Sequence, residues 1–168
     1  MVFNFLMFKN QILVPLGEYL VSDDPQKELV TVVGSCVAVI LYDRENQIGG
    51  LAHIVLPGRR LSIRKNDKSA YYADTGVFLL IEEMIKKKAQ KENISAYLAG
   101  GASLNSKVDN NETIGRKNIA SVVSILRKKD TYIKKKDKDI GGFSGRRVVL
   151  DIGTGDVKVR QTAHYKIL

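Results

Sequence analysis

The chain has 168 residues, 44% of them hydrophobic, and its 27 Lys and Arg against 18 Asp and Glu give a formal net charge of +9. This length and apolar content suffice for one sizeable core and do not require a second domain. The single cysteine, Cys36, excludes an internal disulfide, and the two histidines, His53 and His164, are too few and too scattered for a zinc cluster. We therefore expect a cytoplasmic protein without a metal or another cofactor.

The positive charge is concentrated in four short runs, at residues 59–60, 86–88, 127–129 and 134–136. Such runs favour an acidic partner, or they form a solvated face. Apart from Tyr132 they lack interleaved aromatic residues, and no nucleic-acid-binding motif is recognisable, so a nucleic-acid partner would rest on net charge alone and is not expected. The longest nearly apolar run, residues 29–42, is too short to cross a bilayer, and no membrane insertion is expected.

Residues 1–11 are predicted to be an N-terminal extension ahead of a single domain at 12–168. Residues 12–21 carry Pro15 and Gly17 and suit an edge strand or a turn. Residues 29–33 form a strand that leads into Gly34, Ser35 and Cys36, where a glycine and a small serine ahead of a thiol would let a substrate approach the backbone. A simple bend in a strand is the alternative at this point.

A hairpin is predicted from the apolar runs at 37–42 and 48–56, which flank a polar turn at 43–47. If the turn is centred between Arg44 and Glu45, Cys36 lies opposite His53, with Cβ atoms about 5 Å apart. An imidazole at that distance would accept the thiol proton and hold the thiol pKa well below the roughly 8.5 of a free cysteine. A longer loop or a bulge would turn His53 to the other face, and both residues would then be ordinary core side chains.

The rest of the chain alternates between helical and strand patterns. A helix is predicted over residues 73–85, with Ser69 as its N-cap, and a second helix over 116–129. A strand at 94–99 runs into a glycine turn, residues 132–136 suit a basic edge strand, and residues 147–152 and 157–162 predict a second hairpin.

Six segments in this order resemble the bacterial chemoreceptor glutamine deamidase family CheD, over nearly the whole chain after Ile12. They are TVVGSCVAVILYD from Thr31, GGLAHIVLP from Gly49, YADTGVFLLIEEM from Tyr72, AGGAS from Ala99, IGRKN from Ile114 and GGFSGRRV from Gly141.

The resemblance implies an α+β fold of stacked, mostly antiparallel sheets with two main helices packed against them, similar to the deamidase domain of cytotoxic necrotizing toxins. It implies that Cys36 is the nucleophile, that His53 is the general base and that Thr31 completes the site by orienting either His53 or the substrate. Backbone groups near Gly34 and Ser35 would contact the substrate or hold the oxyanion.

The implied activity is conversion of glutamine side chains to glutamate on the cytoplasmic helices of chemoreceptors, with a CheC-type phosphatase as a further partner. The alternative is a non-catalytic protein that binds and regulates that phosphatase.

Overall fold

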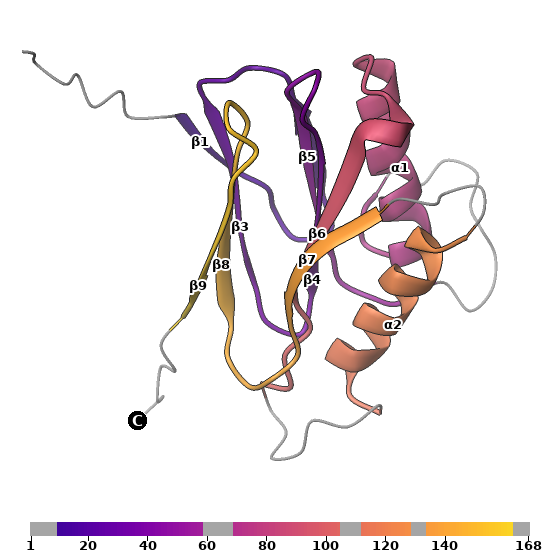
Figure 1. The fold of residues 1–168 in the computed structure, drawn as a ribbon. Coiled ribbons are helices and arrows are strands. Elements are labelled where there is room, and N and C mark those ends of the chain that lie inside the picture. Colours follow the sequence, from indigo (N-terminus) through magenta and orange to yellow (C-terminus); the bar gives the residue numbers. More distant parts are fainter. Residues whose placement is uncertain (1–9, 59–68, 105–111, 129–133, 163–168) are drawn as a thin grey trace, which may run out of the picture.

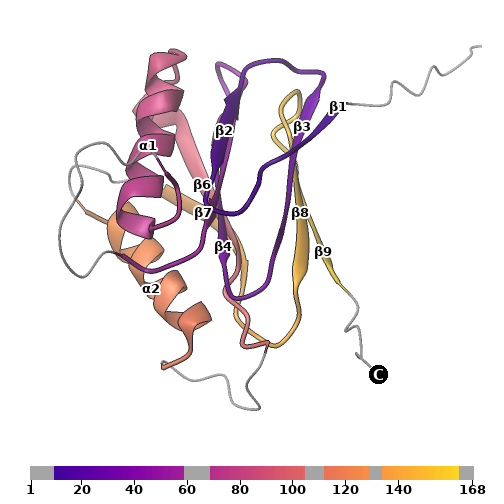
Figure 2. The ribbon, with the colours of Figure 1, turned by 180° about the vertical axis from the view of Figure 1, so that it is seen from behind.

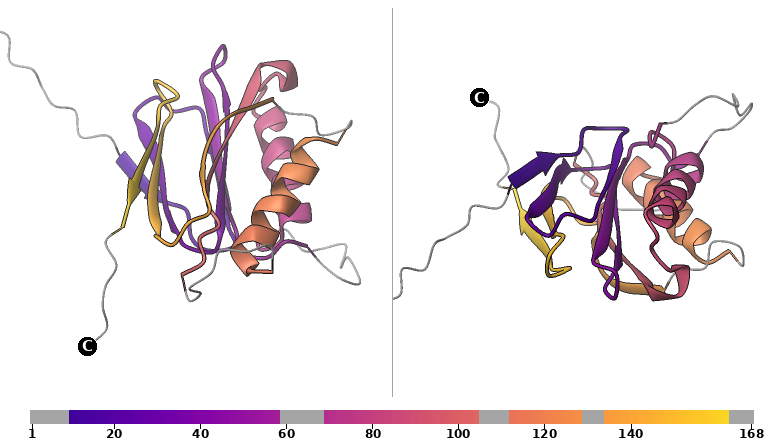
Figure 3. Two further views of the ribbon diagram at one scale, coloured as in Figure 1. Left: turned by 60° about the horizontal axis from the view of Figure 1, so that its bottom comes forward. Right: turned by 90° about the horizontal axis from the view of Figure 1, so that it is seen from above.

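The computed structural model describes residues 10–58, 69–104, 112–128 and 134–162, which form three stacked layers (Figures 1 and 3). The first layer is a four-stranded sheet of order β1-β3-β8-β9, in which only the β1 and β3 pair is parallel. Its strands are β1 (Asn10–Leu13), β3 (Lys27–Val33), β8 (Arg146–Asp151) and β9 (Val157–Gln161).

The middle layer is a five-stranded sheet of order β2-β5-β4-β6-β7, antiparallel except between β6 and β7. Its strands are β2 (Tyr19–Ser22), β4 (Val37–Asp43), β5 (Ile48–Ile54), β6 (Ile94–Gly100) and β7 (Lys134–Ile140). The third layer is formed by α1 (Ala73–Lys86) and α2 (Ile114–Leu126), which cover only the outer face of this sheet (Figure 2), and a 3₁₀ turn (Lys91–Asn93) precedes β6. The predicted α+β class is therefore confirmed.

Strand β4 lies at the centre of both hydrophobic cores. Val37, Val39 and Leu41 face the helices, while Ala38 and Ile40 face the four-stranded sheet, and all five side chains are fully buried. A strand buried on both faces needs a continuous apolar sequence rather than an alternating one, which accounts for the unbroken run in this part of the chain.

The helix positions agree with the predictions, but one predicted cap is wrong. The N-cap of α1 is Tyr72, which makes no side-chain capping hydrogen bond. Ser69 instead accepts a hydrogen bond from the backbone amide of Tyr71 and donates to the carbonyl of Gly17, so it ties the segment before α1 to the turn before β2. At α2, the Thr113 side chain caps the helix by accepting from the amide of Arg116.

The segment at residues 12–21 contains the end of β1, a turn at Gly17 with a φ of 76°, and the start of β2, and both strands lie at sheet edges. The predicted hairpin near the C-terminus is confirmed as β8 and β9, and β7 is an edge strand that begins at Lys134. Residues 1–9 of the predicted extension, the basic pair at 59–60 and His164 lie outside the described residues. Within the described ranges, no helix is long and apolar enough to cross a membrane.

Candidate active site

The only cysteine lies on a three-residue link between the two sheets. Strand β3 ends at Val33 in the four-stranded sheet, strand β4 begins at Val37 in the five-stranded sheet, and Gly34, Ser35 and Cys36 connect them. The link is at the bottom of the view in Figure 1. Cys36 is partly buried and packs against the core between the sheets, so its thiol lies at the edge of the same layer into which both sheets project their inner side chains.

The β4–β5 hairpin is regular, but its register differs from the predicted one by two residues. Ala38, not Cys36, is the residue paired with His53, because the centre of the loop lies one residue further along the chain. The prediction that Cys36 lies directly opposite His53 is therefore wrong. A shift of two residues leaves side chains on the same face, so His53 still points into the layer between the sheets.

His53 is held by Thr31, which projects from the other sheet. The Thr31 Oγ1 and His53 Nδ1 atoms are 2.8 Å apart, and the Thr31 hydroxyl also donates to the Val14 carbonyl oxygen at 3.0 Å. A hydroxyl has only one proton to donate, and Thr31 donates it to the Val14 carbonyl. The Thr31 oxygen must therefore accept a hydrogen bond from His53, so the hydrogen of the neutral imidazole is on Nδ1. Nε2 is then the basic nitrogen, and it is buried without a hydrogen-bond partner among the described residues. Of the two roles proposed for Thr31, this geometry supports orienting His53.

Burial disfavours the charged forms of both Cys36 and His53. It raises the pKa of the Cys36 thiol above its ordinary value, against a smaller opposing effect from a hydrogen bond donated by the residue's own backbone amide. It also lowers the pKa of His53. These directions favour a thiol and a neutral imidazole over a thiolate–imidazolium pair, and the low thiol pKa expected from direct opposition is not found.

Glycines allow the Gly34–Cys36 link to lie close to the end of β6. The amide of Gly101 donates to the Cys36 carbonyl at 2.7 Å, and the amide of Ala102 donates to the Gly34 carbonyl at 2.8 Å. Gly100 has a φ of 106°, and a Cβ atom there would overlap the Cys36 carbonyl oxygen. Any larger residue at Gly100 would therefore displace the link that carries the thiol.

Asn118 is a buried polar residue that the sequence reasoning did not select, although it ends the IGRKN segment. It lies on α2, is fully buried, and donates to the Ser35 carbonyl at 3.0 Å and to the Val55 carbonyl at 2.9 Å. Its position shares a helix face with the buried Val122 and Ile125, and a polar residue on an otherwise apolar face was the available signal.

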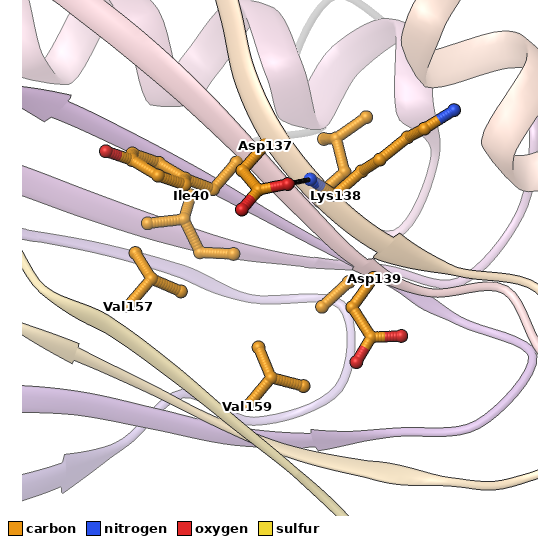
Figure 4. Close-up of a pocket in the computed structure, with 9 residues that line it drawn as sticks. Ile40, Asp137, Lys138, Asp139, Val157 and Val159 are labelled. Atoms are coloured by element: carbon orange, nitrogen blue, oxygen red, sulfur yellow. Dashed lines mark hydrogen bonds between the residues drawn. The ribbon is translucent and has the colours of Figure 1, made fainter.

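A separate cavity of about 240 Å³ opens between β7 and β9 (Figure 4). Val157 and Val159 line it from β9, and Ile40, Asp137 and Asp139 line it from the five-stranded sheet. It does not include the cysteine, histidine or threonine described above. Among the described residues, no group of three or more His, Cys, Asp and Glu side chains is arranged to hold a metal ion.

Comparison with known proteins gives consistent matches over most of the chain. Residues 55–161 match the family model described as CheD chemotactic sensory transduction. A protein of Methanococcus maripaludis named "Probable chemoreceptor glutamine deamidase CheD" is 38% identical over 156 residues, which cover 92% of this chain and 97% of that protein. The "Chemoreceptor glutamine deamidase CheD" of Thermotoga maritima is 39% identical over 148 residues, covering 88% of this chain and 90% of that one.

Proposed function

The chain belongs to the CheD family of chemotactic sensory transduction proteins, and we propose on this basis that it is a cysteine-dependent deamidase that converts glutamine side chains of chemoreceptors to glutamate in the cytoplasm. The observation that carries the proposal is the Thr31–His53 hydrogen bond, because it leaves the basic His53 Nε2 free in the layer that Cys36 borders.

The first half of the reaction transfers the acyl group to the cysteine. The Cys36 sulfur attacks the carboxamide carbon of the glutamine side chain while His53 Nε2 accepts the thiol proton. The developing negative charge on the amide oxygen is stabilised by the backbone amide of Cys36, the N–H of the residue that carries the attacking sulfur. The imidazolium then gives its proton to the departing nitrogen, so that ammonia leaves and a thioester remains.

The second half restores the enzyme. A water molecule attacks the thioester carbon as His53 Nε2 removes its proton, and the carbon–sulfur bond breaks to give glutamate and a Cys36 thiolate, which takes its proton back from the imidazolium. The sum is addition of one water and loss of one ammonia. Because His53 is neutral at the start, it serves as base and then acid without a resting ion pair.

Exposed apolar side chains beside the site support a protein substrate rather than a small amide. Leu104 lies directly over Gly34 in the nucleophile link and is 49% exposed. Leu16 is 55% exposed, and its neighbour Gly17 donates its backbone amide to the His53 carbonyl at 3.1 Å. Two exposed leucines, one over the link that carries Cys36 and one next to a residue that binds the His53 backbone, suit the apolar face of a helix, which is the form of the proposed chemoreceptor segment.

The test is mass spectrometry of a chemoreceptor cytoplasmic fragment incubated with wild type and with Cys36→Ala. Wild type should convert specific glutamines to glutamate, a gain of about one mass unit each, and Cys36→Ala should not. Circular dichroism should show the variant folded, because a thiol-to-methyl change removes little buried volume. Equal conversion by both proteins, or none by wild type, would refute the proposal.

The competing proposal is a non-catalytic partner of a CheC-type phosphatase. It expects Cys36→Ala to retain every biological effect of the wild type. The Nε2 atom of His53 argues against it: it is buried without a partner in the part of the chain that the structure describes, and a buried polar atom without a partner lowers stability and needs a functional explanation.

A further inference from the structure

We infer that Asn118 is a positioning residue of this site: its side-chain amide fixes the direction of the Cys36 backbone N–H that stabilises the oxyanion. The inference rests on the proposed function and adds to it a residue from α2, a helix that supplies no side chain to the reaction itself.

The first argument comes from the end of the β4–β5 ladder. The last paired residues are Val37 and Ile54, and the amide of the next residue, Val55, donates instead to the Tyr71 carbonyl at 3.0 Å. Beyond that point the carbonyls of Ser35 and Val55 have no partner within the ladder. Asn118 supplies one hydrogen to each of them, and it thereby joins the nucleophile link to the strand that carries His53.

The second argument comes from the orientation of the Asn118 amide. Both Nδ2 hydrogens are used, and Oδ1 is buried without a partner in the described part of the chain. The reverse orientation would place Oδ1 against two carbonyl oxygens, so the assignment of the two amide atoms is unambiguous. An unpaired buried oxygen lowers stability. The role of Asn118 is therefore to donate its two hydrogen bonds.

The third argument is the planarity of the peptide bond. In a trans peptide the C=O of one residue points away from the N–H of the next. The Ser35 carbonyl is directed towards Asn118, so the Cys36 N–H is directed away from α2. The carbonyls of Gly34 and Cys36 are also held, by Ala102 and Gly101. Without Asn118, the Ser35–Cys36 peptide is the one whose rotation becomes free.

The test compares two reactions of the same sulfur. Glutamine deamidation passes through a tetrahedral oxyanion, whereas alkylation by iodoacetamide displaces iodide from carbon and forms none. Asn118→Leu has a similar volume and no donor. We expect it to lower kcat for the receptor fragment by about 10- to 100-fold, while KM and the alkylation rate at one alkaline pH change by less than about 3-fold.

Ser121→Ala is the matched control, because Ser121 lies one turn further along α2 and donates to the carbonyl of Pro57, outside the link. It should retain the wild-type kcat. Wild-type kcat in folded Asn118→Leu would overturn the inference, and so would a parallel loss of deamidation and alkylation. If Asn118→Leu does not fold, Asn118→Ser is the second variant, because it keeps one donor. It should show an intermediate loss of kcat. An unchanged kcat in Asn118→Ser would also overturn the inference. A wild type that converts no glutamine would refute the proposed function instead.

Discussion

Thr31 and His53 meet across the space between the two sheets, with 2.8 Å between the threonine Oγ1 and the imidazole Nδ1. Thr31 belongs to β3 of the four-stranded sheet and His53 to β5 of the five-stranded sheet. The tautomer of the histidine is therefore set by a residue of the opposite sheet, which is in turn anchored to the Val14 carbonyl.

Replacement of Thr31 by valine should impair both catalysis and stability. The change keeps the shape but removes the hydroxyl, so the imidazole loses the acceptor that keeps the proton on Nδ1. We expect kcat for the receptor fragment to fall by about 10- to 100-fold, with a loss of about 1–3 kcal/mol in the free energy of unfolding from the unpaired Val14 carbonyl and His53 Nδ1. Thr31→Ser should stay near wild type in kcat. A Thr31→Val variant with wild-type kcat would exclude a role for the hydroxyl.

The Cys36 thiol should not be activated: it should lose its proton no more readily than a free cysteine. Burial raises the pKa of Cys36, so alkylation by iodoacetamide should rise only at alkaline pH in the native protein. The same chain unfolded in urea is the matched control, since it contains the same single cysteine without burial, and its profile should lie at lower pH. A native profile below the unfolded one would indicate a thiolate stabilised by His53, which contradicts the pKa directions given above.

His53 should make stability depend on pH below neutrality. Burial lowers the pKa of His53 in the folded chain below its ordinary value of 6.5. As the pH falls below 6.5, the unfolded chain therefore binds a proton that the folded chain does not, and folding stability decreases towards acid pH. Urea unfolding at several pH values should show this loss in wild type. His53→Gln should lose less over the same window, and an equal loss in both proteins would mean that His53 is not buried as a neutral group.

Gly100→Ala should disturb the nucleophile link. Gly100 has a φ of 106°, and an added Cβ would overlap the Cys36 carbonyl oxygen. We expect a loss of about 2 kcal/mol or more in the free energy of unfolding and a lower kcat, measured by urea unfolding and ammonia release. Gly58→Ala is the control, because its Cβ would make only an ordinary contact with Asp74 at 3.5 Å, and it should stay within about 0.5 kcal/mol of wild type. Equal effects of the two substitutions would contradict the close approach.

Hydrophobic pattern predicted the β4–β5 hairpin but could not fix its register. Both strands are mostly apolar on both faces, and a shift of two residues leaves each side chain on its own face, so only the loop conformation distinguishes the alternatives. That loop includes Gln47 with a φ of 51°, a left-handed conformation that could not be predicted from a glutamine. Helix positions were predictable because each helix has one polar and one buried face.

The pairing of Thr31 with His53 was beyond local sequence reasoning for a different reason. The two residues are 22 positions apart and lie in different sheets, so their contact depends on how the sheets pack rather than on any spacing within one element. The same holds for Asn118, which is 83 positions from Ser35. Its helical position indicated burial, but its two acceptors are backbone carbonyls, which have no signature in the sequence.

The place of β3 in its sheet also determines when a newly synthesised chain can become active. Strand β3 lies between β1 and β8, and β8 begins only at Arg146. A nascent chain that still lacks β8 contains Thr31, Cys36 and His53, but it has no four-stranded sheet to hold the threonine against the imidazole. The proposed nucleophile is thus translated early, but its partners are held in place only after β8 has also left the ribosome.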